Sequence, residues 1–307
     1  MPVKVSVICP SWNRAVGRSI RSVARQTFRD IELIVVDDGS VPPLDLDNAA
    51  GDGTFVRVIS HATNRGPAAA RNTGAAAAQG EWLAFIDSDD EWTPLKLERQ
   101  LAFAELQPHA AEPAAYVTGF SSRDKMRGQT VECIPRPAGS VEEFASGCWC
   151  CPGSTLLIRR DTFLGLGGYD DKLFRLEDYE FFLRFGLAGG TMHVLPEYLS
   201  HIHIQNVPRI DRVDHATTHV LEKYKQSKEI TGPVLRSIAA FCRLARASTY
   251  YRHRKFFRTL WNLALSWTLV PRRTVHLIDR FPDRPPTPAS TRADLHQQSL
   301  IKPVLGP

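Results

Sequence analysis

The chain has 307 residues, 43% of them hydrophobic and 23% charged, which is ordinary globular composition and argues against a wholly disordered chain. Its formal net charge of +5 is a mild excess that does not by itself imply a nucleic-acid partner. The chain does not open on a basic segment followed by a long apolar one, and no apolar run approaches the roughly 20 residues of a spanning helix. We therefore expect neither a signal peptide nor a membrane span.

Strand and helix patterns alternate over the first hundred residues. Short apolar runs predict strands at 3–9 (ended by Pro10), 32–36, 55–59 and 82–86. Periodic or alanine-rich stretches predict helices after residue 14, over 68–79 and over 95–106, the last capped by Thr93. This order predicts an α/β fold with a doubly wound sheet, in which ligands bind at the carboxyl ends of the strands.

The middle of the chain is less regular. Further strands are expected at 115–120, 154–158 and 192–195, a polar loop over 121–139 and a helix over 179–187. The cysteines of Cys148-Trp149-Cys150-Cys151 lack the spacing and histidines of a zinc site, so we expect reduced thiols.

The pattern changes after about residue 208. Residues 234–273 are helical in pattern and rich in arginine, with no acidic residue among them. Such helices fit either an anionic membrane surface or packing on the preceding domain with a solvated basic face. We predict a domain over 1–207, a basic helical extension over 208–281 and a Pro-rich, disordered tail over 282–307.

Polar and acidic residues follow three of the predicted strands. Ser11-Trp12-Asn13, Asp37-Asp38-Gly39-Ser40 and Asp87-Ser88-Asp89-Asp90 each stand where a strand ends. Parallel strands bring such ends to one edge, so the three segments are expected to line one cleft. Buried carboxylates need a partner, and their oxygens suit Mg²⁺ or Mn²⁺, although the last segment alone also fits a loop that caps the next helix.

Residues 3–207 resemble a family 2 glycosyltransferase with the GT-A fold. The matching segments keep their order and spacing: Val5–Asn13, Gln26-Thr27-Phe28, Glu32–Ser40, Asn64–Gly74, Phe85–Asp90 and Glu177-Asp178. The resemblance implies a GT-A type, Rossmann-like mixed sheet and transfer from a nucleotide-diphosphate sugar. It does not cover the helical extension.

The resemblance also implies where the donor binds. Asp38 matches the residue that contacts uracil, Arg71 an arginine that helps to hold the nucleotide, and Asp87 the residue near the ribose. The remaining positions that it assigns to the nucleotide-sugar site are Pro10, Trp12, Asn13 and Ser88. Arg71 also fits an ordinary surface position on a helix.

A divalent metal is part of the same resemblance. Asp89 matches the second aspartate of the family's Asp-x-Asp motif, which binds Mg²⁺ or Mn²⁺ on the diphosphate. His203 stands where many members complete the metal site, although a strand histidine is also often structural. Asp90 either supports these ligands or caps the next helix.

Asp178 matches the catalytic base of the family, in a Glu-Asp pair at a helix start. A carboxylate there would take the proton of the acceptor hydroxyl as its oxygen attacks the anomeric carbon with inversion. Glu177 would position Asp178 or touch the acceptor. A plain alternative is a helix N-terminal carboxylate that the dipole favours. The chain lacks a Gln-x-x-Arg-Trp segment, which favours transfer of single sugars over polymerisation.

These observations predict an inverting, metal-dependent glycosyltransferase with a UDP-sugar or another nucleotide sugar as donor. The expected acceptor is a hydroxyl of a glycan or a lipid-linked intermediate, as in polysaccharide and cell-envelope biosynthesis. The expected location is the cytoplasm, with peripheral contact at the inner face of the membrane through the basic helices, and no nucleic acid is expected as partner.

Three other functions are weighed against this prediction. A haloacid-dehalogenase-type phosphatase would need its aspartate after the first strand, whereas Asp87 follows the fourth. A dinucleotide dehydrogenase would need a Gly-x-Gly-x-x-Gly turn after the first strand. An inactive protein that binds nucleotide sugars and docks on membranes is the remaining alternative, and the retained Asp89 and Asp178 argue against it.

Overall fold

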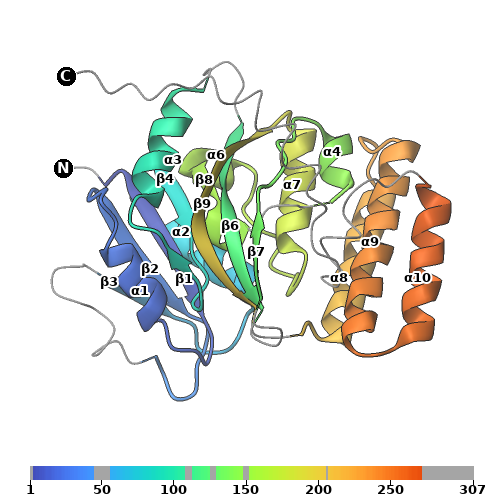
Figure 1. Cartoon of the computed structure of the whole chain (residues 1–307), viewed down its shortest axis with the longest axis horizontal. Coiled ribbons are helices and arrows are strands. Elements are labelled where there is room, and N and C mark those ends of the chain that lie inside the picture. Colours follow the sequence, from blue (N-terminus) through green and yellow to red (C-terminus); the bar gives the residue numbers. More distant parts are fainter. Residues whose placement is uncertain are drawn as a thin grey trace.

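The computed structural model describes residues 3–44, 56–107, 113–124, 129–147, 152–204 and 207–271 (Figure 1). The strands are β1 (Val5–Ser11), β2 (Ile31–Asp37), β3 (Val56–Ser60), β4 (Trp82–Phe85), β5 (Glu91–Trp92), β6 (Ala114–Asp124), β7 (Gln129–Cys133), β8 (Leu157–Arg159) and β9 (Thr191–Ile204). The helices are α1 (Gly17–Ala24), α2 (Pro67–Ala77), α3 (Lys96–Glu105), α4 (Val141–Ala145), α5 (Pro152–Thr155), α6 (Arg160–Gly165), α7 (Glu177–Leu187), α8 (Ile210–Lys225), α9 (Gly232–Arg252) and α10 (Phe256–Leu269).

The described strands form one mixed sheet in the order β3-β2-β1-β4-β8-β6-β9-β5, with β7 paired to β6. The first four are parallel, and β8 is antiparallel to both β4 and β6. Because β1, β2 and β4 are parallel neighbours, their carboxyl ends meet at one edge of the sheet. The prediction that three polar segments share this edge is confirmed.

Helices cover both faces of the sheet, as predicted. Apolar side chains of α1 and α3 pack on one face, and those of α2, α6 and α7 on the other. The small residues of α2 allow it to lie close to β1: a Cβ at Gly74 would stand 2.5 Å from a methyl carbon of Ile8. This close approach fixes the start of α2, and with it Arg71, against the strand ends.

Four predicted element boundaries are wrong. Strand β1 continues through Pro10 to Ser11, since proline lacks the N–H donor but keeps its carbonyl acceptor. Residues 154–158 divide into α5 and β8, because Ser154 turns inward to bond the Asp87–Asp90 segment. Thr93 does not cap α3, which begins after Leu95 with no side-chain cap. Strand β9 is one continuous strand from Thr191 to Ile204, because it pairs with β6 along its whole length.

The predicted polar loop over 121–139 is also partly wrong. Strand β6 extends to Asp124, and β7 pairs with it in a hairpin from Phe120↔Cys133 to Asp124↔Gln129. A hairpin at the margin of a sheet exposes much of its surface, so its polar sequence resembles that of a loop.

The C-terminal helices pack in order beyond α7 at the end of the molecule opposite β3 (Figure 1). Helix α8, which lies within the predicted helical extension but was not delimited as a helix, buries Val213, Ala216, Val220 and Tyr224 at helical spacing. Apolar residues of α8 and α9 share one core with α7, where the rings of Tyr179 and Phe241 stack 4.0 Å apart. Within the described residues, no helix is both long and apolar enough for a membrane span.

The segment Cys148–Cys151 and the tail over 282–307 lie outside the described residues. The predicted division at 207, 281 and 282 stays a prediction.

Candidate active site at the carboxyl edge of the sheet

The segment after β2 holds the loop that leads into α2. The carboxylate of Asp38 accepts hydrogen bonds from the backbone N–H groups of Arg65 (2.9 Å) and Gly66 (2.8 Å). His61 Nδ1 lies 2.7 Å from the same carboxylate. Gly66 adopts φ +94°, a conformation that glycine tolerates without strain. Asp38 is therefore buried with three hydrogen bonds, which leaves little of its acceptor capacity for a nucleotide base.

The segment after β1 forms a tight turn against the segment after β2. Asn13 is left-handed at φ +51°, and its side-chain oxygen accepts from Val41 N at 2.8 Å. Its own N–H donates to Ser40 Oγ at 2.8 Å. The neighbouring Trp12 side chain is 44% exposed, so its ring face is available for stacking. Asn13 thus orders the turn, and Trp12 is the member of the pair that is free to meet a ligand.

Arg71 connects the strand edge to the predicted base. From α2 it donates to Asp87 Oδ1 at 2.7 Å and to Glu177 Oε1 at 3.0 Å, and its guanidinium lies 5.7 Å from the centre of the Tyr169 ring. Burial lowers the pKa of Arg71, but the charges of Asp87, Glu177 and Asp178 outweigh burial and hold that pKa well above its ordinary value. A permanent buried cation thus joins residues 87 and 177, which are far apart in sequence.

Asp178 lies in the first turn of α7. Leu176, the residue just before α7, adopts φ +64°, which is a strained conformation for leucine. This conformation sets the direction in which the helix begins. Burial and then the charge of Glu177 raise the pKa of Asp178 to about 7, and Arg71 opposes this rise. Its Oδ1 atom is buried without a hydrogen-bond partner among the described residues. A carboxyl group of this kind can take up a proton near neutral pH.

The acidic turn after β4 is held by Ser154 of α5. The Ser154 hydroxyl accepts from Asp87 N at 3.0 Å and donates to Asp90 Oδ2 at 2.5 Å. Asp90 Oδ1 accepts from His203 N at 2.9 Å, which ties the turn to β9. Burial and then Asp87 raise the pKa of Asp90 to about 8. The alternative that Asp90 caps the next helix is wrong, because it bonds Ser154 and β9 instead.

Two arginines of the β1–α1 segment meet the predicted metal ligands. Arg14 pairs with Asp89, and Arg18 donates to His203 Nε2 at 3.1 Å while its Nε lies 3.0 Å from Glu91. Burial raises the pKa of Asp89, and the Arg14 charge partly offsets it. Asp87 and Asp89 of the acidic turn therefore each pair with an arginine, Arg71 and Arg14 respectively.

The donor set fits a divalent metal that a substrate completes. Asp89 and His203 offer one carboxylate oxygen and one imidazole nitrogen, both acceptable to Mn²⁺. Across the described ranges, no three His, Cys, Asp or Glu side chains converge as a protein-only cage. Catalytic Mg²⁺ is commonly held by one or two carboxylates together with substrate phosphates. The residues therefore suit a metal that shares its coordination with a diphosphate.

Sequence reasoning missed four residues of this site: Arg14, Arg18, His61 and Ser154. Arg14 lies next to Asn13, so its proximity to the strand edge could have pointed to it. His61 directly follows β3, a predicted strand, so its place at a strand end could also have pointed to it. Ser154 carries no such signal, because it reaches the site through the packing of α5. The structure brings together Asp87, Asp89, Asp178, Glu177 and Arg71 as a connected set.

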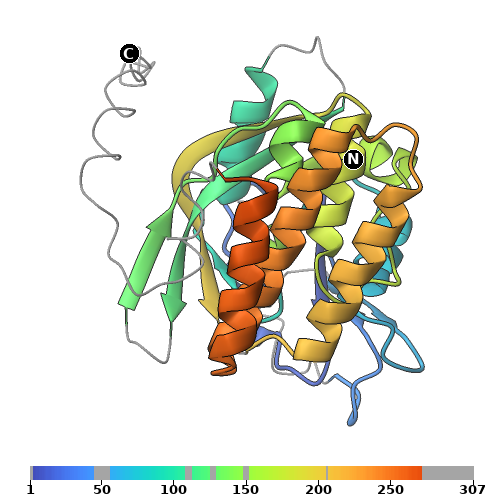
Figure 2. The same ribbon diagram turned by 90° about the vertical axis from the view of Figure 1, so that its right-hand side faces the viewer.

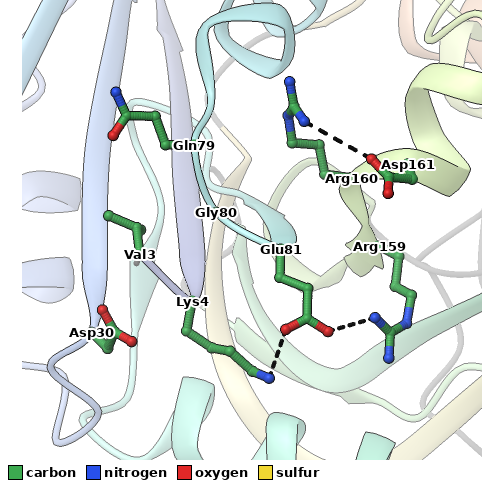
Figure 3. Close-up of a pocket in the computed structure, with 9 residues that line it drawn as sticks. All are labelled: Val3, Lys4, Asp30, Gln79, Gly80, Glu81, Arg159, Arg160 and Asp161. Atoms are coloured by element: carbon green, nitrogen blue, oxygen red, sulfur yellow. Dashed lines mark hydrogen bonds and ion pairs between the residues drawn. The ribbon is translucent and has the colours of Figure 1, made fainter. Parts of the chain in front are cut away.

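A concave region lies at the opposite end of the same strands (Figure 3). It has a volume of about 580 Å³ and is lined by Val3, Lys4, Asp30, Gln79, Gly80, Glu81, Arg159, Arg160 and Asp161. None of the predicted site residues lines it. Lys4, Asp30 and Glu81 precede β1, β2 and β4, so this cavity opens at the amino ends, away from the acidic turn.

The comparisons with known proteins agree with this geometry. The model of glycosyl transferase family 2 matches residues 6–164, just over half of the chain. The chain belongs to glycosyl transferase family 2. The predictions of this family and of a glycosyltransferase are confirmed.

Three relatives illustrate the range of similarity. An uncharacterized glycosyltransferase of Haemophilus influenzae is 31% identical over 188 residues, which cover 59% of this chain and 61% of that protein, less than two thirds of its length. An uncharacterized glycosyltransferase of Nostoc sp., alr2836, is 28% identical over 282 residues, covering 86% of each chain. The amylovoran biosynthesis glycosyltransferase AmsB of Erwinia amylovora is 23% identical over 214 residues, covering 66% of this chain and 70% of that one.

Solved structures share the fold. S. aureus TarS 1-349 in complex with UDP-GlcNAc aligns with a TM-score of 0.57 at 16% identity, over 85% of this chain and 90% of that one. The mannosyltransferase PcManGT of Pyrobaculum calidifontis, in complex with GDP-Man and Mn²⁺, aligns with a TM-score of 0.56 at 18% identity, over 87% and 74%. The predicted GT-A type sheet with a C-terminal helical extension is confirmed.

Proposed function

We propose that this chain transfers a single sugar from a nucleotide-diphosphate sugar to a hydroxyl of a glycan or lipid-linked acceptor, with inversion at the anomeric carbon. One observation carries the proposal. Asp178, a carboxyl group with a pKa of about 7, is linked through Glu177 and Arg71 to Asp87 of the acidic turn. These links hold the base at a fixed distance from the donor site, as in-line attack on the anomeric carbon requires.

In this proposal the donor lies along the carboxyl edge of β1, β2 and β4. The uracil ring stacks on Trp12 beside Pro10, with Asp38 and Asn13 shaping the base pocket through the turns that they order. The ribose lies at Asp87 and Ser88, and Arg71 offsets negative charge near the diphosphate. Asp89 and His203 would hold Mg²⁺ or Mn²⁺, which supplies charge stabilisation for the leaving diphosphate.

Asp178 then acts as the general base. Its carboxylate takes the proton of the acceptor hydroxyl while that oxygen forms a bond to the anomeric carbon. The bond between the anomeric carbon and the diphosphate oxygen breaks on the opposite face, and the nucleoside diphosphate leaves with its electron pair. Glu177, bonded to Arg71, keeps α7 and Asp178 at a fixed distance from the donor.

The relatives support the substrate class. UDP-GlcNAc and GDP-Man are the donors named with the TarS and PcManGT structures, the latter with Mn²⁺, and AmsB is named for amylovoran biosynthesis. We therefore rank UDP-sugars first and GDP-sugars second, and infer a role in polysaccharide or cell-envelope biosynthesis. We place the protein in the cytoplasm, in peripheral contact with the inner face of the cell membrane.

A donor screen tests this proposal. Thermal shift is measured with UDP-, GDP- and dTDP-sugars, with and without Mn²⁺. A correct donor at about 100 times its Kd adds about 2.7 kcal/mol and so raises Tm by several degrees. Asp89→Ala should remove the part of the shift that depends on Mn²⁺, whereas Asp161→Ala, at an exposed carboxylate near the opposite cavity, should leave it unchanged.

Two outcomes would count against the proposal. Absence of a shift with all three nucleotide classes would remove the donor assignment. A normal shift without turnover on any hydroxyl acceptor, unchanged by Asp178→Asn, would favour the inactive, nucleotide-sugar-binding alternative.

A further inference from the structure

Helix α10 has its apolar side facing outward. Its buried residues are polar: Thr259, Asn262 and Ser266. Five of its large apolar residues are exposed by more than half, while three leucines of the helix (Leu263, Leu265 and Leu269) are partly buried. The five are Phe256 (57%), Phe257 (81%), Leu260 (67%), Trp261 (57%) and Trp267 (61%). Spacings of four and seven residues put these five side chains on one side of the helix, which we call the α10 apolar face. An amphipathic helix of a globular domain normally has the reverse arrangement.

The contacts of α10 explain how it is held in this orientation. The Ser266 hydroxyl donates to the carbonyl of Ala240 in α9 at 2.8 Å, and Asn262 Oδ1 accepts from Arg243 of α9 at 3.4 Å. Small polar side chains therefore fix α10 to α9 by hydrogen bonds. Figure 2 shows α10 alongside α9 at the outside of the helical extension. The orientation is built into the packing, so the outward apolar face is a feature of the fold.

Basic side chains gather at the start of α10. Arg252 at the end of α9 is exposed, as are Arg254 and Lys255 in the α9–α10 connection, and Arg258 follows one turn later, also exposed. No aspartate or glutamate occurs between Glu229 and Asp279. Five exposed aromatic and aliphatic side chains beside four cations, with no nearby acid in sequence, are the composition of an interfacial helix on an anionic bilayer.

The basic connection lies at the catalytic edge of the molecule. His253 Nε2 lies 2.9 Å from the carbonyl oxygen of Pro208, and Pro208 follows β9, whose residue His203 belongs to the candidate metal site. A surface that attracts the α9–α10 connection would thus lie on the side of the molecule where the strand ends open.

We infer that the α10 apolar face, with the adjacent cations, docks this protein on an anionic lipid bilayer. The helix has 14 residues, which is too short for a span of about 20, so it lies in the interface with its aromatic side chains in the headgroup region. The purpose of docking rests on the proposed function, since it would bring a lipid-linked acceptor to the catalytic edge. The positive charge of the α9–α10 connection favours an anionic bilayer as the partner. A second copy of this chain is disfavoured, because its own basic connection would repel that of the first copy.

Vesicle binding of the full chain tests the inference directly. We expect partition onto vesicles of equal parts phosphatidylglycerol and phosphatidylcholine, weak partition onto pure phosphatidylcholine, and release by high salt, because the basic side chains act through a screened potential. Fluorescence of Trp261 and Trp267 should shift to the blue on binding, and both should be open to collisional quenchers before it.

Two variants separate the parts of the surface. Phe257→Ser with Trp261→Ser and Trp267→Ser should lower partition on the order of a hundredfold, because three large apolar side chains are lost from the interface. Arg252→Gln with Arg254→Gln and Lys255→Gln should lower it by a similar factor, at about fivefold for each charge. The matched control, Val58→Ser with Leu106→Ser, removes exposed apolar side chains elsewhere and should leave partition unchanged.

Other results would overturn the inference. Unchanged partition of the aromatic variant would show that this face does not meet lipid. A full-length dimer that the aromatic variant converts to a monomer would make the face an interface between copies, and tryptophans shielded from quenchers before lipid is added would show that the chain covers it. Asp178→Asn should bind vesicles normally, so failure of lipid binding and failure of sugar transfer remain distinguishable.

Discussion

The two ends of the parallel strands carry charge in different ways. At the carboxyl ends, Arg71 and Glu177 pair with only 5% and 10% of their side chains exposed. At the amino ends, Glu81 pairs with Lys4 and Arg159, and the three side chains are 41%, 34% and 35% exposed (Figure 3). Both ends contain ion pairs, and a hollow of about 580 Å³ lies at the amino end. Ion pairing and concavity alone therefore do not identify the active site.

The pKa values make the same distinction. Burial raises the pKa of Asp178 to about 7 and that of Asp90 to about 8, whereas the hydrogen bond from Lys4 lowers the pKa of Glu81. A buried carboxyl group whose charge is not fully offset by cations or hydrogen bonds has a raised pKa and can exchange a proton near neutral pH. A carboxyl group in a solvated ion pair has a lowered pKa and stays ionised. The comparison predicts large functional effects at the carboxyl end and small effects at the amino end.

The largest effect is expected for Asp178→Asn. Loss of the base should lower transfer roughly 10²–10⁴-fold, while donor affinity in calorimetry stays near that of the wild type. In the wild type, kcat/KM should rise with pH up to about 7 and then level off, because Asp178 acts when deprotonated. Retained turnover, or an unchanged pH profile, would remove Asp178 from the role of base.

The same variant should be more stable than the wild type above neutral pH. The folded pKa of Asp178 lies above its ordinary value of 3.8, so its contribution to stability is full below that value and is lost as pH rises through about 7. Asparagine carries no charge at any pH and avoids this loss. Denaturant unfolding at pH 6 and pH 8 should therefore show a gain for Asp178→Asn that grows with pH; equal curves at both values would contradict the burial argument.

A large loss of stability is expected for Arg71→Met. The change leaves the buried Glu177 and the partly exposed Asp87 without their cation, and breaking a buried pair typically costs about 3–5 kcal/mol. Arg99→Met is the matched control, because Arg99 pairs with Glu197 at the surface and should cost less than about 1 kcal/mol. Chemical denaturation of both variants measures the difference, and similar losses would mean that the Arg71 pairs are effectively solvated.

The sequence predicted the acidic segment at the end of the parallel strand β4, but it did not predict the hydrogen bonds that join this segment to α5 and β9. Asp87 and Asp89 follow a run of apolar residues, so a buried strand and an acidic end could both be read from local pattern. The bond from Asp90 to His203 N depends on where β9 passes the turn, and the bonds of Ser154 depend on how α5 packs. Such positions follow from tertiary contacts between segments 64 to 113 residues apart, for which local sequence carries no periodic signal.

The C-terminal helices show the same limit in another form. The arginine-rich pattern predicted helices over residues 234–273 but left their packing open. Helix α9 buries Ile238, Phe241 and Leu244, as its apolar pattern requires, whereas α10 buries three polar residues. Hydrophobic periodicity gives the apolar side of a helix, and the structure alone gives the direction in which that side faces.

An intermediate effect is expected for Ser154→Ala. The variant removes the hydroxyl that joins Asp87 N to Asp90 Oδ2 and leaves both buried groups without that partner, at a cost of about 1–3 kcal/mol. Because the acidic turn loosens, KM for the donor should rise more than kcat falls. Ser22→Ala is the control, since this buried serine bonds only its own helix through Ser19 O and should cost less. Equal kinetics for Ser154→Ala and the wild type would show that the turn holds its shape without this serine.

The smallest effect is expected at the amino end, for Glu81→Gln. Glu81 lies 2.7 Å from Lys4 and also bonds Arg159, but the group is solvated, so its loss should cost less than about 1 kcal/mol. Its pKa is lowered in the folded protein, so its contribution is present above its ordinary value and is lost as pH falls through the folded one. The difference from the wild type should therefore shrink in acid and in high salt, with transfer kinetics unchanged throughout. A change in kcat or KM from this substitution would connect the amino-end cavity to catalysis and end the contrast between the two edges.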